Sequence, residues 1–287
     1  MTSDSKEIHD VPPLRARRPD SHKGDYGKVL IIAGSRFMPG AAVLAARAAY
    51  RAGSGVVTVL SDTDVVPIIA AGVVEAIHTD WATLGAELAI GDALPYDAAL
   101  VGPGLGIEDR GRLVLEFLRT ADLPVIIDAD ALNLVARDVI ARDRRDLLPN
   151  REDRIWTPHP GELQRLTGQK PRRRIERLEA ANEFATSFGG VVALKGHRTV
   201  VADASQHAFN QTGNAGMATA GSGDVLAGIL VGLLGHGYAP FEAARLAVHL
   251  HGASGDSAAE RFGQASMTAS DMIDELPDVM QSHPVSG

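Results

Sequence analysis

Short apolar runs alternate with helical patterns along most of this 287-residue chain, and that alternation restricts its fold more than any other feature. The runs are rich in Val, Ile, Leu and Ala, and each leads into a loop with a glycine, a proline or polar residues. They span residues 28–34, 55–61, 97–104, 124–130 and 154–160. Strands that are apolar throughout are typical of parallel sheets covered on both faces. We therefore expect an α/β fold in which a mainly parallel central sheet carries helices on both faces.

Helices and a hairpin complete the expected order of elements. An Ala-rich helix is predicted over about 40–52, and two helices over about 222–235 and 239–260 close the order. The runs 190–196 and 198–203 lie close together and are predicted to form a hairpin at one edge of the sheet. Only 5% of the residues are aromatic, which also favours an α/β protein over a β-sandwich.

Composition limits the partners and the compartment. The net charge of −8 gives no general attraction to nucleic acid, and the lack of cysteine excludes disulfides and thiolate metal sites. The first twenty residues contain no apolar segment typical of a secretory signal, and the longest apolar stretch, Val225–Gly235, is too short to span a bilayer. We expect a cytoplasmic protein that binds neither nucleic acid nor membranes.

The chain is predicted to hold one domain, because no break in composition marks a linker. This domain is expected over residues 21–277. Residues 1–20 are predicted to form a flexible N-terminal arm, and residues 278–287 a C-terminal tail.

Glycines and an acid open the run "TAGSGDVLAGILVGLLG" at residues 219–235. Gly221 and Gly223 allow a ligand to approach the backbone closely, and the amide groups at a helix start attract anions. Ser222 could serve simply as a capping side chain. The carboxylate of Asp224, however, would be repelled by an anion bound there. The sequence therefore predicts an anion site in which Asp224 has a chemical role.

Other candidate residues follow at strand ends, where ligands bind in parallel sheets. "VGPGLG" at 101–106 could hold a phosphate or form only a tight turn. Gly40 and Ala41, both small, start a helix that faces the expected cleft. "DADALN" offers acids of which one could cap a helix and another could reach the cleft. His249 and His251 are two residues apart on a predicted helix, so their side chains diverge, and each is interpreted as a surface or core histidine.

Two further motifs carry polar side chains. "TPHPGELQRLTG" places His159 and Glu162 on one face of a helix start, where Glu162 could instead only interact favourably with the helix dipole. "LKGHRTVV" places Lys195, Gly196 and Thr199 in a turn against which a base or a phosphate could lie. Because these motifs all fall at strand ends, together they indicate a ligand of nucleotide size.

The motifs together resemble those of one enzyme family. "GSGDVLAG", following "NQTGNAGMATA", resembles the signature of the ribokinase-like superfamily. With "SHKGDYGKVLIIAGSRFMPGAA", "VGPGLG", "DADALN", "TPHPGEL" and "LKGHRTVV", the chain is similar to the ADP/ATP-dependent (S)-NAD(P)H-hydrate dehydratases from about Ser21 to Leu276. The resemblance implies a ribokinase-like three-layer fold in the stand-alone form of that family. It also implies Mg²⁺ and a phosphate donor, ADP or ATP.

The implied substrates are the hydrated forms of NADH and NADPH, called NADHX and NADPHX. Hydroxide leaves the nicotinamide ring poorly, whereas phosphorylation of the ring hydroxyl creates a group that leaves readily. The resemblance also implies a homotetramer that works with a separate NAD(P)HX epimerase. The sequence leaves open the preference between ADP and ATP and that between NADHX and NADPHX.

The resemblance and the motifs together imply a role for each candidate residue. Asp224 is expected to be the catalytic base, and Glu162 to contact Mg²⁺ through water. The substrate-binding residues are expected to be Gly40, Ala41, Gly104, His159 and Asp224. The nucleotide-binding residues are expected to be Lys195, Gly196, His197, Arg198, Thr199, Gly221, Ser222 and Gly223.

Three alternatives remain at this stage. A ribokinase-like kinase of a vitamin precursor, such as a hydroxymethylpyrimidine or a thiazole alcohol, would share the "GSGD" turn. A non-catalytic nucleotide sensor would keep the fold but would gain nothing from an acid beside phosphate. A dinucleotide-binding oxidoreductase is disfavoured, because Ile107 stands where its fingerprint requires a third glycine.

Overall fold

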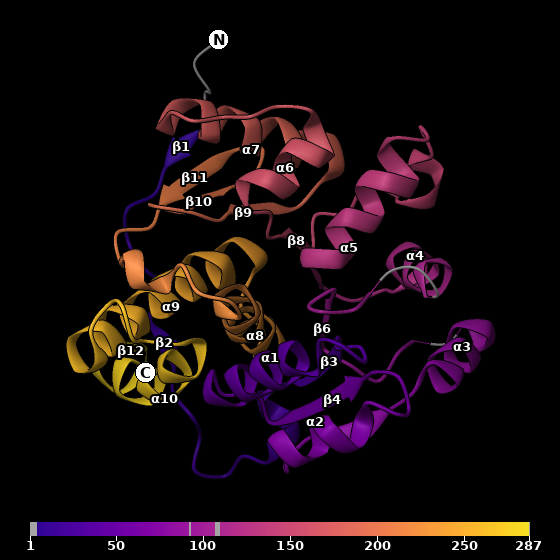
Figure 1. The fold of residues 1–287 in the computed structure, drawn as a ribbon, viewed down its shortest axis with the longest axis horizontal. Helices are drawn as coiled ribbons and strands as arrows, with labels where there is room; N and C mark the ends of the chain where they lie inside the picture. The colour runs from indigo at the N-terminus through magenta and orange to yellow at the C-terminus, as the bar shows by residue number, and fades with distance from the viewer. Residues whose placement is uncertain (1–4, 92, 107–109, 287) are drawn as a thin grey trace.

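The structure, a computed structural model, describes residues 5–91, 93–106 and 110–286 (Figure 1). Ile107 lies outside these ranges. The larger of its two sheets has ten strands in the order β1-β11-β10-β9-β8-β7-β6-β3-β4-β5. They are β1 (Lys6–Glu7), β3 (Lys28–Ile32), β4 (Val56–Leu60), β5 (Ile77–Thr79), β6 (Ala98–Val101), β7 (Val125–Ile127), β8 (Arg154–Trp156), β9 (Val191–Leu194), β10 (Val200–Ala202) and β11 (Gln206–Phe209).

The pairing of these strands confirms a mainly parallel sheet. Within it, β10 pairs antiparallel with β9 and β11, and the other described pairs are parallel. The predicted hairpin therefore forms, as β9 and β10. Its predicted place at the edge of the sheet is wrong, because β11 and β1 pair beyond it. These two strands are short, and β1 joins the sheet only by pairing with β11, about 200 residues later in the chain.

Helices cover both faces of the sheet, so the expected three layers are present. One layer holds α1 (Pro39–Arg51), α2 (Val66–Gly72), α8 (Ser222–Gly235), α9 (Pro240–Phe262) and α10 (Ala269–Ser282). The other holds α3 (Trp81–Ile90), α4 (Gly111–Thr120), α5 (Ala129–Leu134), α6 (Pro160–Thr167) and α7 (Arg174–Phe188). Strand β3 shows why two cores form: Val29 and Ile31 pack into the first layer, whereas Leu30 and Ile32 pack into the second.

Shorter elements connect these layers. Four of them are helical: η1 (Lys23–Tyr26), η3 (Arg145–Leu147) and η4 (Ala215–Met217) are 3₁₀ turns, and η2 (Val135–Ile140) is a π-helical extension of α5. A separate two-stranded sheet pairs β2 (Leu14–Arg15) with β12 (Val285–Ser286).

The described parts of the N-terminal arm and C-terminal tail contact the rest of the protein. Besides the pairing of β1 and β2, the Arg245 side chain donates a hydrogen bond of 2.7 Å to the carbonyl oxygen of Asp10. Helix α10 continues through Pro277 and ends at Ser282. The sequence patterns did not indicate these contacts, and the domain limits drawn from them stay a prediction.

Helix α8 lies at the centre of the first layer and positions the candidate site. It is buried from Val225 to Leu234, because it packs between α1, α9 and the central strands (Figure 1). The lack of a side chain at Gly228 brings α8 against α1, since a Cβ there would overlap the carbonyl oxygen of Ala45. None of the helices in the described ranges is long and apolar enough to cross a membrane.

Candidate active site

Helix α8 begins at a glycine N-cap. Gly221 occupies the N-cap with a φ of +87°, and a Cβ there would lie 2.5 Å from Leu44 Cδ1. Within the described residues, no side chain caps this terminus. Ser222, which could have served as the cap, is instead the first residue of the helix, and its Oγ lies 3.2 Å from Nε2 of His251. Uncapped amide groups at a helix start attract an anion.

Asp224 lies in the first turn of α8, beside these amide groups. Burial and repulsion from Asp128 raise the pKa of its carboxyl to about 6, although the charge of Lys195 acts in the opposite direction. A carboxyl group with a pKa near neutrality can accept a proton from a substrate and release it again. Asp224 is therefore suited to general-base chemistry at an anion site.

Lys195 links the carboxyl ends of three neighbouring strands. It follows β9, and its Nζ donates a hydrogen bond of 2.7 Å to Oδ1 of Asp128, which follows β7. The same Nζ lies 3.9 Å from Oε2 of Glu162, in the helix that follows β8. Burial lowers the pKa of Lys195, but the two carboxylates outweigh it, so its pKa is raised and the side chain is charged. The ion pairs place one positive charge among acids close to the terminus of α8.

Asp128 was not among the candidate residues, although the sequence indicated that an acid of "DADALN" could reach the cleft. It occupies the N-cap position of α5 but makes no capping hydrogen bond with its side chain. Asp130 instead accepts a hydrogen bond of 2.9 Å from the amide of Gly106, which ties "VGPGLG" to "DADALN". The useful signal was an acid directly after one buried strand and a lysine directly after another, two strands away in the sheet.

His159 and Glu162 form the start of α6. Nδ1 of His159 accepts a hydrogen bond of 2.9 Å from the amide of Gly161, and Glu162 Oε2 accepts one of 2.7 Å from the amide of His159. The structural interpretation of this motif as a helix start is thus confirmed. Burial raises the pKa of Glu162, and Lys195 opposes that shift. Glu162 therefore both caps a helix and belongs to the charged cluster around Lys195.

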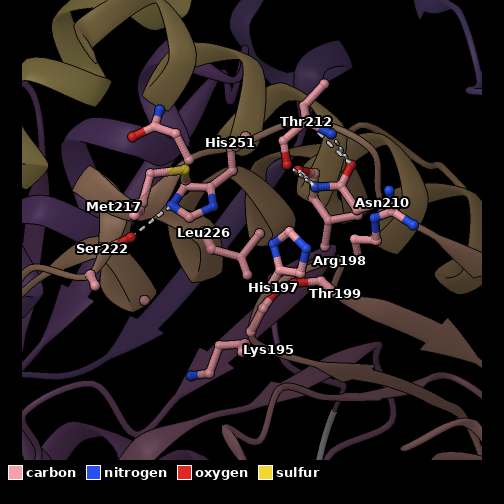
Figure 2. A pocket seen from close by; sticks show the side chains of 18 of the residues that line it. Lys195, His197, Arg198, Thr199, Asn210, Thr212, Met217, Ser222, Leu226 and His251 are labelled. Atoms are coloured by element: carbon pink, nitrogen blue, oxygen red, sulfur yellow. Dashed lines mark hydrogen bonds between the residues drawn. The ribbon is translucent and has the colours of Figure 1, made fainter. Parts of the chain in front are cut away.

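A cavity of about 740 Å³ extends from the start of α8 toward α9 (Figure 2). Its walls come from the turn between β9 and β10, the loop after β11, and α9. Eight of the candidate residues line it: His159, Lys195, Gly196, His197, Arg198, Thr199, Ser222 and Gly223. The loop after β11 adds residues 210–215, and α9 adds Val248, His251 and Gly252, which sequence reasoning did not propose. A volume of this size suits a nucleotide.

The remaining candidates lie outside this lining. Gly221 is the N-cap of α8, and Glu162 and Asp224 interact electrostatically with Lys195, which does line the cavity. Gly104 has a φ of +57°, and a Cβ there would lie 2.8 Å from that of Ala41, so these two residues are neighbours. Gly40 is the second residue of α1 and has open space where a side chain would be.

Comparison with known proteins agrees with this architecture. Residues 29–278 match the family model described as NAD(P)H-hydrate dehydratase. The chain is 39% identical over 289 residues to the bifunctional NAD(P)H-hydrate repair enzyme of Thermofilum pendens, covering 96% of this chain and 54% of that protein. It is 39% identical over 257 residues to the ADP-dependent (S)-NAD(P)H-hydrate dehydratase of Neisseria meningitidis, covering 88% of this chain and 84% of that one. The chain thus spans about half the length of the bifunctional relatives it matches.

A solved structure gives the same result in three dimensions. The ADP/ATP-dependent NAD(P)H-hydrate dehydratase of Bacillus subtilis, co-crystallized with ATP/Mg²⁺, superposes with a TM-score of 0.79 at 34% identity, over 94% of each chain. Its sheet and helices therefore follow the arrangement described above. The fold is ribokinase-like, and the chain belongs to the NAD(P)H-hydrate dehydratase family.

Proposed function

We propose that this protein repairs damaged nicotinamide cofactors by converting (S)-NADHX and (S)-NADPHX back to NADH and NADPH, with ADP or ATP as the phosphate donor. The observation that carries the proposal is the raised pKa of Asp224 beside the uncapped terminus of α8. An alcohol is phosphorylated only if its proton is accepted and the charge of the transferring group is stabilised. Asp224 and the adjacent amide groups supply these two functions.

The reaction proceeds in two stages. Asp224 accepts the proton of the ring hydroxyl while its oxygen forms a bond to the terminal phosphorus of the nucleotide, and the bond to the departing nucleotide breaks. The ring nitrogen then uses its lone pair to expel phosphate, and the neighbouring ring carbon loses a proton, which restores the dihydropyridine. The amide groups from Gly221 to Asp224 face the charge that develops on the phosphoryl group during the first stage.

The two ligands occupy neighbouring regions in this proposal. The nucleotide lies in the large cavity, against the turn from Lys195 to Thr199 and against Ser222 and Gly223, and it also contacts Gly221 at the N-cap of α8. The hydrated dinucleotide lies on the other side of Asp224. There it contacts the small residues Gly40, Ala41 and Gly104. It also contacts His159, which lines the nucleotide cavity. Both reacting groups then meet at the start of α8.

The site fits an Mg²⁺ ion whose ligands come mainly from the nucleotide phosphates rather than from a cluster of protein side chains. Among the described residues, no three His, Cys, Asp or Glu side chains are placed to hold a metal ion together. Mg²⁺ commonly takes substrate phosphates and water as most of its ligands and one or two carboxylates besides. Glu162, buried close to Lys195, is the carboxylate that we assign to such a water-mediated contact. Bound there, the ion would neutralise charge on the donor phosphates.

We also propose that the protein acts in the cytoplasm as a homotetramer, alongside an NAD(P)HX epimerase. An epimerase would complement it, because the dehydratase family acts on the S form of the hydrate. Sedimentation velocity tests the proposed tetramer directly.

The function is tested by restoring absorbance of the reduced ring from purified (S)-NADHX or (S)-NADPHX, with ADP and ATP assayed in parallel. The wild-type protein should restore it only when a nucleotide is present. Asp224→Asn should still bind nucleotide but lose at least about a hundredfold in turnover, because it lacks the base. Asp274→Asn, which removes an exposed carboxylate in the middle of α10, is the matched control and should be unaffected.

Two results would contradict this proposal. Consumption of nucleotide on a vitamin-precursor alcohol, with no recovery of NADH, would identify a kinase instead. Near-full turnover of Asp224→Asn at saturating substrate would remove the proposed base.

A further inference from the structure

His251 is a partly buried polar side chain to which the proposed reaction gives no role. It lies on α9 in the wall of the large cavity, and its Nε2 is 3.2 Å from Oγ of Ser222 (Figure 2). Burial lowers its pKa to about 4, so the imidazole is neutral at physiological pH. His249, two residues earlier, diverges as predicted, and its ring lies against that of His283.

The backbone around His251 is held by side chains of an adjoining loop. Thr212 Oγ1 donates a hydrogen bond of 2.9 Å to the carbonyl oxygen of His249, and Asn210 Nδ2 donates one of 3.0 Å to that of Val248. Both partners belong to the loop after β11, which lines the same cavity. The backbone that carries His251 is therefore held against this loop independently of the contact between the His251 ring and Ser222.

Either side chain can be the donor in the hydrogen bond between His251 and Ser222. A neutral imidazole has one nitrogen that donates and one that accepts. If the Ser222 hydroxyl donates to Nε2, its remaining lone pairs face the anion site and repel a phosphate. If instead Nε2–H donates to Oγ, the hydroxyl hydrogen is free to point at the anion. A bound phosphoryl group therefore favours the second arrangement.

We propose that His251 is a positioning residue that donates from Nε2 to Ser222 Oγ and thereby turns the Ser222 hydroxyl toward the phosphoryl group in transfer. This inference rests on the proposed function, because it needs a transferring group at the start of α8. Ser222 is the first residue of that helix, two residues before Asp224. Its hydroxyl thus lies beside the place where charge develops, whereas most of the expected nucleotide contacts belong to the turn after β9.

The effect of His251 should consequently appear in kcat rather than in nucleotide binding. An interaction that strengthens in the transition state lowers kcat when it is removed, whereas one made equally in the ground state changes KM. Loss of one well-directed hydrogen bond to a charged group corresponds to about a tenfold loss of rate.

The test compares two amides of different length at this position. The side-chain nitrogen of Gln is three bonds from Cβ, as Nε2 of histidine is, whereas that of Asn is one bond closer and cannot reach Ser222. His251→Asn should lower kcat about tenfold and change the KM of the nucleotide less than about twofold. His251→Gln should restore most of the rate. His249→Asn is the matched control on the same helix and should keep the wild-type kcat.

Ser222→Ala completes a double-mutant cycle. Alone it should lower kcat about as much as His251→Asn does, and adding His251→Asn to it should produce no further loss, because both changes remove the same hydroxyl contact. Losses that multiply, or a His251→Gln variant as slow as His251→Asn, would overturn the inference while leaving the dehydratase function intact. A raised nucleotide KM with unchanged kcat would also overturn it. A wild-type protein with no dehydratase turnover would instead reject the proposed function and this inference with it.

Discussion

Removal of the Lys195 ammonium should destabilise the fold strongly, because it leaves two buried carboxylates without their cation. The side chains of Asp128 and Glu162 are only 2% and 7% exposed. With an effective dielectric constant of about 20, the attraction of Nζ to these carboxylates at 2.7 and 3.9 Å is about 6 and about 4 kcal/mol. The desolvation of all three groups offsets much of this attraction.

The net effect follows from what remains after the change. Lys195→Met keeps most of the side-chain volume, so it opens no large cavity. Breaking a buried ion pair by removing one partner lowers stability by about 3–5 kcal/mol. We expect a loss of this size in the free energy of unfolding at pH 7, measured by urea denaturation. Lys170→Met, which removes an exposed lysine, is the matched control and should change stability by less than about 0.5 kcal/mol.

The pH dependence separates lost charge from lost packing. Burial already raises the pKa of Glu162, and Lys195 opposes this shift, so the variant should hold that pKa higher still. A carboxyl group whose pKa is higher in the folded than in the unfolded state binds more protons when folded, so the fold gains stability as the pH falls. The difference between wild type and Lys195→Met should therefore shrink from pH 7 to pH 5. A loss below about 1 kcal/mol, or a difference that does not change with pH, would refute this reasoning.

Two further predictions concern α8 and its acid. Gly228→Ala should lower the free energy of unfolding by about 1–3 kcal/mol, because its Cβ would overlap the Ala45 carbonyl. Gly85→Ala, on a helix with space beside it, should raise the free energy of unfolding by up to about 1 kcal/mol. Similar effects of both substitutions in urea denaturation would contradict the close packing of α8. Since Asp224 must be ionised to accept a proton and its pKa is about 6, kcat/KM should fall as the pH drops below about 6, and a flat profile between pH 5 and 7.5 would exclude it as the base.

Local rules explain which parts of the fold could be predicted from the sequence. In the centre of the sheet, β6, β7 and β9 are continuous apolar runs, and β3 is one after Lys28. The start of α8 is marked by Gly221 next to an apolar stretch. Such signals depend only on neighbouring residues. Strand β1 has two residues and exposed side chains, so its pairing with β11 depends on contacts with a distant part of the chain. Nothing in its own sequence indicates a strand.

The candidate site was predictable to a similar degree. The sequence indicated the anion turn and the motifs at strand ends, and the family resemblance implied a role for their residues. The pairing of Lys195 with Asp128 was not, because these residues are 67 positions apart and meet only through the strand order β7-β8-β9. His251 was missed for a related reason. The helical period separates it from His249, but only the packing of α9 against the loop after β11 decides which of them faces the cavity.

The start of α8 is locally unfavourable for stability, and the rest of the helix explains how it is maintained. The terminus has a glycine N-cap, amide groups without a side-chain cap, and a carboxyl group whose pKa is raised by burial. When ionised, Asp224 therefore lowers the stability of the fold as the pH rises above its unfolded pKa. The buried turns from Val225 to Leu234 oppose this, since they bury apolar surface against α1, α9 and the sheet. Rigid packing along the helix thus allows an unsatisfied, reactive terminus to persist at its end.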